Sequence, residues 1–192
     1  MGKVVFDISM SLDGFVTASG RSAEQPTGLG GEQLTQWAFG QDERNRSFLA
    51  DAVADLGAVI AGRETYDTSL PWWGTDGPSG EARRPVFVVT HREGTPPEGG
   101  VYQFVTGGIE QALQRAQDAA ADQVVCIMGG AEMGQQYLEA GLLDEISLHV
   151  VPVLFGSGTR LFDNVPSRHV QLALADSLST PDAVHLRYQV AK

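Results

Sequence analysis

Short apolar runs alternate with amphipathic segments along most of the chain, and this alternation is typical of an α/β fold. The apolar runs predict strands over residues 3–9, 58–61, 85–90, 102–105, 124–128, 146–154, 171–179 and 183–190. The amphipathic segments predict helices over residues 44–56, 109–120 and 131–140. In the second of these helices, the face that we expect to pack on the sheet carries Ile109, Leu113, Ala116 and Ala120.

The order of these elements predicts a mixed sheet, with parallel strands early in the chain and an antiparallel pair at its end. The predicted strand over 146–154 contains Pro152, which cannot donate a hydrogen bond to a neighbouring strand and therefore marks an edge or a bulge. Gly141 follows the last helix, in the position where glycine commonly ends a helix. We expect one α/β domain over residues 1–192, with a largely parallel central sheet flanked by helices.

Two segments rich in glycine and proline interrupt this pattern. Residues 18–31 contain four glycines, and residues 69–84 contain three glycines together with Pro71, Trp72 and Trp73. Loops of this length inside a compact domain are more often functional than accidental. Because each is followed by an element that needs the same core, we interpret both as loops near a site rather than as linkers between domains.

The amino-acid composition excludes several classes of function. The chain has 192 residues, with 13 Lys and Arg against 24 Asp and Glu, so its formal net charge is −11. This acid excess argues against a nucleic-acid partner, because binding nucleic acid requires a basic patch. The single cysteine, Cys126, excludes an intramolecular disulfide framework and a cysteine-based zinc site, and no metal site is expected. Since Cys126 lies in an apolar run, we interpret it as a small buried residue.

The sequence also predicts where the protein acts. No stretch approaches the roughly 18–20 apolar residues that a membrane span requires. Asp7 interrupts the apolar run at the N-terminus, which therefore lacks the core of a signal peptide. We expect a cytoplasmic protein that acts on a small molecule and has no membrane partner.

Glycines, hydroxyl groups and cations follow three of the predicted strands. One strand runs into Gly129 and Gly130 at the start of a helix, where a ligand can approach unpaired N–H groups closely. The glycines are spaced G-G-x-x-x-G, which does not match the dinucleotide fingerprint G-x-G-x-x-G. Two other strands end in Gly-Arg-x-Thr at 62–65 and in Thr-His-Arg at 90–92. Ligands bind outside the carboxyl ends of strands in such sheets, so these ends predict a site for a phosphate-rich ligand, with tight turns and helix caps as the alternative.

Several motifs occur together in an order that resembles one superfamily. They are Ser11-Leu12-Asp13-Gly14-Phe15, the segments 60–66, 86–90 and 127–130, and the segments 138–146 and 152–162. Over residues 3–190 the chain resembles the dihydrofolate-reductase-like superfamily. Within it, the chain is similar to the reductase domain of bifunctional riboflavin-biosynthesis deaminase-reductases and their stand-alone bacterial relatives. The resemblance implies a dihydrofolate-reductase-like fold and an NADPH-dependent reductase similar to 5-amino-6-(5-phosphoribosylamino)uracil reductase, with hydride transfer to a heterocyclic or ribosylated pyrimidine-type substrate.

The resemblance also implies which residues bind the cofactor. Two turns would hold the pyrophosphate of NADPH, a third would meet the adenosine 2′-phosphate, and the first strand and its loop would lie beside the nicotinamide. The implied cofactor-binding residues are Ser9, Val16, Thr17, Gly62, Arg63, Thr65, Thr90, His91, Arg92, Gly129, Gly130, Ala131 and Glu132. The two arginines in this set favour NADPH over NADH, because a 2′-phosphate is best bound beside arginine.

The substrate side has several candidates. Asp13 is the acid shared with the riboflavin-pathway group, and it is either a turn residue or a catalytic acid that binds or protonates the substrate. Trp37 and Trp72 are candidates for stacking on a flat heterocycle, with core packing as the alternative for at least one of them. Gly158 lies in a glycine-rich segment that either holds a ribose phosphate or is a plain loop.

Two alternatives to this function stay open. Folate reductases carry an acid on the first helix, but Arg46 or its neighbours occupy that position here, and the nearest acids are Asp42 and Glu43. The chain could therefore be a dihydrofolate reductase with a displaced acid, or a nucleotide-binding protein of the same fold without catalytic activity. Three further polar candidates lack ligand spacing and are interpreted as structural or surface residues, namely His149, His169 and His185.

A homodimer is expected from the late strands. The segment 149–155 is more apolar than a solvent-facing strand of a small domain, and an exposed apolar edge is most often covered by a two-fold partner. The alternative is that the last two strands of the same chain cover it.

Overall fold

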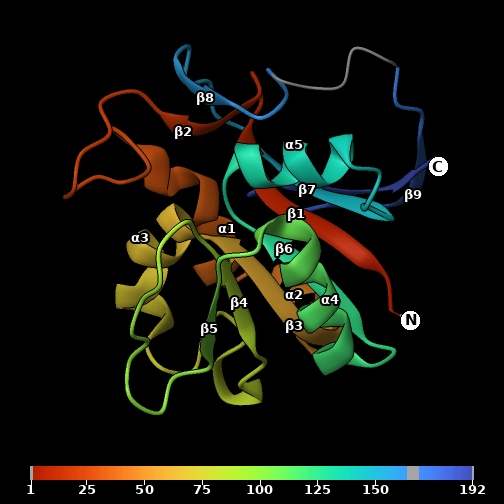
Figure 1. Ribbon diagram of the computed structural model, residues 1–192. Helices are drawn as coiled ribbons and strands as arrows, with labels where there is room; N and C mark the ends of the chain where they lie inside the picture. Colours follow the sequence, from red (N-terminus) through yellow and green to blue (C-terminus); the bar gives the residue numbers. More distant parts are fainter. Residues whose placement is uncertain (1, 164–168, 192) are drawn as a thin grey trace.

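An eight-stranded mixed sheet forms the centre of the computed structural model, which describes residues 2–163 and 169–191 (Figure 1). Its strands lie in the order β5-β4-β3-β6-β1-β7-β10-β9. Their bounds are β1 (Val4–Ser11), β3 (Leu56–Gly62), β4 (Val86–Val89), β5 (Tyr102–Val105), β6 (Val124–Met128), β7 (Glu145–Val151), β9 (Leu172–Ser179) and β10 (Val184–Val190). Neighbours are parallel from β5 to β7, whereas β10 pairs antiparallel with both β7 and β9. The predicted mixed sheet is therefore confirmed.

Helices cover both faces of this sheet. They are α1 (Gln36–Phe39), α2 (Glu43–Asp55), α3 (Arg63–Trp73), α4 (Gly108–Ala120) and α5 (Ala131–Glu139), with 3-10 turns at Gly31–Thr35 and Gly80–Ala82. The largest apolar cluster joins α4 and α5 to one face, through Leu113 and Tyr137 against Phe6 and Ile60. The opposite face is covered by α1, α2 and α3, and Figure 1 shows α4 in front of the sheet and α2 behind it.

The glycine that follows the Gly-Gly pair has a packing role. A Cβ atom at Gly134 would lie 2.2 Å from the ring of Phe6, so only glycine lets α5 approach β1 this closely. Gly141 has a φ of 69° just beyond α5, which confirms its predicted role at the helix end. Cys126 is buried, again as predicted.

One of the two predicted loops is shorter than expected. Residues 19–30 are irregular, in agreement with the sequence, but α3 continues through the first part of the segment 69–84 and contains Pro71. Proline lacks an N–H and normally disrupts a helix interior. Here the helix ends two residues later, at Trp73, so Pro71 removes a single bond in its last turn, and the Gly74 N–H still reaches Leu70 O at 2.9 Å.

The prediction that β7 lies at an exposed edge is wrong. The strand ends at Val151, directly before Pro152, because proline cannot continue the ladder. It pairs with β1 on one side and β10 on the other, so the last two strands of the chain cover it. Val151 is 7% exposed and packs in the core, and the sheet edge on this side is β9.

Sequence analysis missed a short antiparallel pair, formed by β2 (Phe15–Ala18) and β8 (Gly158–Arg160). At Gly158, φ is 142° and a Cβ atom would lie 1.9 Å from Thr17 O, so the pairing requires glycine there. None of the helices in the described part of the chain is long and apolar enough to cross a membrane. Among the same residues, no group of three or more His, Cys, Asp or Glu side chains could hold a metal ion.

Candidate cofactor and substrate site

Four parallel strands bring the predicted motifs to one edge of the sheet. Met128, at the end of β6, lies beside Ala61 of β3 and beside Asp7 of β1. Gly62, at the end of β3, lies beside Val89 of β4. The turns at 62–65, 90–92 and 129–132 therefore follow neighbouring strands and open toward the same space, where ligands of open α/β sheets bind.

The Gly-Gly turn contacts the Gly-Arg-x-Thr turn directly. Gly129 has a φ of 88°, and a Cβ atom there would lie 2.3 Å from Thr65 Oγ1. Gly130 is more open, because its Cβ atom would lie 3.8 Å from the same oxygen. The turn leads into α5 with Ala131 buried and Glu132 exposed, and the first N–H groups of this helix favour an anion.

The two cations of the site differ in their environment. Arg63 Nε donates to both carboxylate oxygens of Asp67, at 2.8 and 2.9 Å, and the guanidinium lies 5.3 Å from the ring centre of Phe104. Arg92 is exposed and has no ion pair among the described residues. Thr90 Oγ1 accepts from the Arg92 N–H at 3.2 Å and fixes the turn, so Arg92 is the cation available to a phosphate.

The residues expected near the nicotinamide are held by neighbouring segments. Ser9 Oγ accepts from Trp37 Nε1 at 3.0 Å, and Thr17 Oγ1 accepts from the Thr159 N–H at 3.2 Å. Val16 is half-buried against the main core. His91 is exposed in the turn after β4.

A cleft of about 520 Å³ lies between α3 and the irregular segment 19–30. Its lining includes Glu64, Thr68 and Trp72 of α3. Arg21, from the irregular segment, forms an ion pair with Glu64 across this cleft. Trp72 is 73% exposed and offers a ring face to a ligand, and the cleft begins beside the Gly-Arg-x-Thr turn.

Trp37, in contrast, does not offer a ring face to a substrate, and the structure contradicts this prediction. It is 5% exposed and belongs to the core. Its ring lies against Phe48, His149 and His185, with centroid separations of 6.1, 4.4 and 4.7 Å. An aromatic residue beside a predicted loop therefore packs inward here, which was the alternative that the sequence left open.

Asp13 joins two loops. Its carboxylate accepts from Ser11 Oγ at 2.6 Å, and from the N–H groups of Phe155 and Gly156 at 3.1 and 2.7 Å. The hydrogen bond from Ser11, together with those from the two N–H groups, lowers the pKa of Asp13 to about 2. A carboxylate held in this way is ionised at neutral pH and is a poor proton donor, so the geometry favours the turn role.

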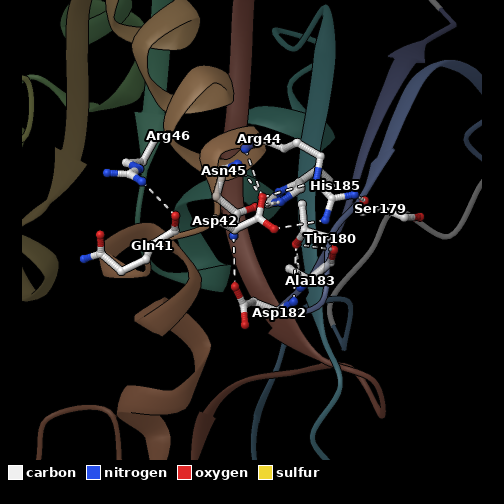
Figure 2. Close-up of polar contacts among 10 residues, drawn as sticks. All are labelled: Gln41, Asp42, Arg44, Asn45, Arg46, Ser179, Thr180, Asp182, Ala183 and His185. Carbon is white, nitrogen blue, oxygen red and sulfur yellow. Dashed lines mark hydrogen bonds and ion pairs between the residues drawn. The ribbon is translucent and has the colours of Figure 1, made fainter.

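Sequence analysis did not find a buried polar cluster on the face covered by α2. We call it the His-pair cluster, and it consists of Asp7, His149, His185 and Asn45. Figure 2 shows its outer end, where Asn45 and His185 meet beside Asp182. Burial, followed by the neighbouring His149, lowers the pKa of His185 to about 4. The only signal in the sequence was polar residues within apolar strands, whose partners become visible once the strand register is known.

The sheet order and the strand-end site together define an α/β protein of the dihydrofolate-reductase-like class. Dihydrofolate reductase from Enterococcus faecalis, in a structure with NADP(H), superposes with a TM-score of 0.63 at 14% identity, covering 100% of this chain and 98% of the other. The family described as the RibD C-terminal domain matches residues 2–186, and the chain belongs to this family.

Two further proteins are similar over their full lengths. A putative riboflavin biosynthesis protein from Shewanella sp. PV-4 superposes with a TM-score of 0.73 at 22% identity, with 100% of both chains covered. The uncharacterized protein YwjB of Bacillus subtilis strain 168 is 24% identical over 196 residues, with 97% of both chains covered. At such identities the superpositions establish the shared fold.

Proposed function

We propose that this protein is an NADPH-dependent reductase that transfers hydride to a small heterocyclic or ribosylated pyrimidine-type substrate. The observation that carries the proposal is the meeting of three strand-end turns at one edge of the sheet, where the first turn leads into α3, the helix that lines the cleft. Membership of the RibD C-terminal domain family supports a reductase of the riboflavin-pathway type. When bound, NADPH supplies the hydride from its nicotinamide ring.

The residues present fit such a cofactor. The open space at Gly130 and the N-terminus of α5 suit a pyrophosphate, and a Cβ atom at Gly130 would fill part of that space. Arg92 would hold the 2′-phosphate, while Arg63 must exchange Asp67 for a phosphate before it can contribute. Segment 19–30 would exclude water from the cleft while its ion pair with α3 is made.

On the substrate side, Trp72 is the residue best placed to stack on a flat ring, because it lines the cleft and is exposed. Gly158 stays a prediction as a substrate-binding residue, and Asp13 stays one as a catalytic acid that binds or protonates the substrate. The structure gives both a local role, in the β2–β8 pair and between two loops respectively.

Replacing Arg92 with alanine should weaken NADPH binding by about 10- to 150-fold and leave NADH binding nearly unchanged. The reason is that a charge-assisted contact to the 2′-phosphate contributes about 1.5–3 kcal/mol. Fluorescence titration of both cofactors measures the effect, with Arg115→Ala, an exposed change on α4, as the control. Equal affinities of the wild-type protein for NADPH and NADH would contradict the proposal.

The second candidate is a nucleotide-binding protein without catalysis, and the state of Asp13 favours it, because an acid with a pKa of about 2 does not protonate a substrate. Quenching of NADPH fluorescence, followed by cofactor oxidation with pyrimidine, folate and quinone acceptors, separates the two. Binding without oxidation by any acceptor supports the second candidate and rejects the reductase.

We also propose a homodimer, now through β9 rather than β7. This edge strand is exposed along most of its length, and Leu172 and Leu174 are 42% and 58% exposed. Covering the edge would satisfy its unpaired backbone groups. Light scattering should give twice the chain mass of 20.5 kDa, and Leu174→Lys should lower it. A single-chain mass for the wild type at micromolar concentration rules the dimer out.

A further inference from the structure

The His-pair cluster forms one hydrogen-bonded row across three strands and a helix. His149 Nε2 lies 3.1 Å from Asp7 Oδ2, and the Nδ1 atoms of His149 and His185 are 2.9 Å apart. His185 Nε2 lies 3.0 Å from Asn45 Oδ1, and Asn45 Nδ2 donates to Asp182 at 3.2 Å. Both histidines are 2% exposed and Asn45 is fully buried, so water satisfies none of these ring nitrogens.

Which atom donates in each of these hydrogen bonds follows from the group at each end of the row, starting at the surface. The exposed carboxylate of Asp182 only accepts, so Asn45 must turn its NH₂ group toward it, as Figure 2 shows. The carbonyl oxygen of Asn45 then faces His185 Nε2, which must carry a proton to donate. At the other end, the carboxylate of Asp7 only accepts, so His149 Nε2 must also carry a proton.

The close contact of the two Nδ1 atoms requires one further proton between them, because two bare nitrogens at 2.9 Å would repel each other. The four ring nitrogens therefore carry three protons. Two neutral imidazoles carry only two, so the His149–His185 pair holds one positive charge. The carboxylate of Asp7 balances it, and the ring of Trp37, 4.4 Å from that of His149, adds a favourable aromatic face.

The titratable groups around the His-pair cluster are compatible with one positive charge on the histidine pair. Burial acts to raise the pKa of Asp7, but the charge and hydrogen bond of His149, with Ser147 and Arg187, outweigh burial and lower it. Burial, and then the charge of the nearby Asp7, raise the pKa of Cys126 on β6 and keep it in its thiol form.

The charged groups nearest the start of α2 are paired with each other. Asp42 and Arg44 bond to each other at 2.9 Å, which leaves neither as the primary partner of the histidine pair.

The inner end of the cluster reaches the cofactor edge. Asp7 lies beside Met128, which directly precedes Gly129, and it is two residues before Ser9 on the same face of β1. The side chain of Asp7 is 28% exposed, whereas that of His149 is 2% exposed. The charge is thus buried behind a carboxylate that is itself accessible beside the predicted nicotinamide position.

We propose that the His149–His185 pair stores one proton, and that Asp7 is the catalytic acid that passes it to the substrate. This inference rests on the reductase function proposed above. Hydride from NADPH forms a C–H bond at the reduced carbon, and the π electrons of the C=N or C=O bond move to the heteroatom. Asp7 differs from Asp13 because a protonated imidazole lies behind it: as the heteroatom gains charge, the proton leaves His149 Nε2 for Asp7 Oδ2, and the carboxyl group so formed protonates the heteroatom. The pair is then neutral, and a proton taken up from bulk solvent through the 28% exposed Asp7 carboxylate restores its charge. His149, His185 and Asn45 act through Asp7 and are positioning residues.

The stored proton is measured first, without cofactor or substrate. Long-range ¹H–¹⁵N NMR of protein labelled with ¹⁵N-histidine at neutral pH should show a proton on Nε2 of both His149 and His185. A third proton should lie on His149 Nδ1 or be shared between the two Nδ1 atoms. Asp7→Asn removes the counter-charge and should reduce the pair to two protons, whereas Asp51→Asn, an exposed change on α2, should leave it unchanged. Two or four protons on the wild-type pair would overturn the inference.

Use of the proton is measured with an acceptor that supports NADPH oxidation. Asp7→Asn should bind NADPH with unchanged affinity but oxidise it about 10²- to 10⁴-fold more slowly, the range for loss of a general acid. Asn45→Ala should instead alter the pH profile of the rate, because it removes the acceptor for His185. Wild-type turnover by Asp7→Asn would overturn the inference. Absence of NADPH binding by the wild type would reject the proposed function and leave the NMR result standing, so the two failures are distinguishable.

Discussion

Gly129→Val should lower the melting temperature by about 5–20 °C, whereas Gly130→Val should lower it less and lose NADPH binding. At Gly129 the new side chain would collide with Thr65 and be held at a φ of 88°. Backbone strain of this kind costs about 1–3 kcal/mol and overpacking about 1–3 kcal/mol more, and each kcal/mol lowers the melting temperature of a chain this long by about 2–4 °C. Thermal unfolding and fluorescence titration of both variants measure the two effects.

Gly130 makes this pair of variants informative. A Cβ atom there meets nothing closer than 3.8 Å, so a side chain at this position would extend into the space proposed for the pyrophosphate with far less crowding than at Gly129. An affinity loss of at least tenfold is expected, about 1.4 kcal/mol. A stable Gly130→Val protein with wild-type affinity for NADPH would show that the pyrophosphate lies elsewhere.

Acid should destabilise the protein between about pH 6.5 and pH 4 through His185. Burial, with the nearby His149, lowers the pKa of His185 to about 4, while the unfolded chain titrates near 6.5. As the pH falls through this window, the unfolded state takes up a proton that the folded state refuses, so stability is lost. At about 1.4 kcal/mol per pH unit, the total approaches about 3 kcal/mol and levels off below pH 4.

Chemical denaturation at several pH values measures this loss. His185→Gln should flatten the dependence over the window, whereas His169→Gln, at an exposed position, should retain it. A wild-type slope in His185→Gln would show that other groups cause the acid sensitivity.

The meeting of the three strand-end turns at one sheet edge was largely predictable because each turn is a short contiguous motif. Gly129 and Gly130 adjoin a strand in the sequence, and parallel strands place their carboxyl ends at one edge whatever their order. The short β2–β8 pair was not predictable, because its strands lie within glycine-rich segments and depend on contacts about 140 residues apart. The helix through Pro71 was missed because proline indicates a loop, whereas in the last turn of a helix it removes only one backbone hydrogen bond.

The His-pair cluster was hidden for a related reason. His149 lies 36 residues from His185 and 142 from Asp7, and only the strand register brings them into contact. A polar residue in an apolar strand is interpreted as a surface or structural residue until its hydrogen-bond partner is known. The role of Trp37 was equally ambiguous, because an aromatic residue beside a loop can either stack on a ligand or pack in the core. The structure shows its ring packed in the core against His149 and His185.

Access to the cleft depends on ionic strength, because Arg21 and Glu64 form an ion pair across it. Their side chains are 38% and 70% exposed, and pairs of this kind contribute about 0–1 kcal/mol and weaken as salt rises. This ion pair therefore ties segment 19–30 to α3 with an energy close to that of thermal fluctuations. Added salt would loosen this contact and speed both entry into the cleft and escape from it, so the residence time of a bound molecule would depend on the ionic strength of the solution.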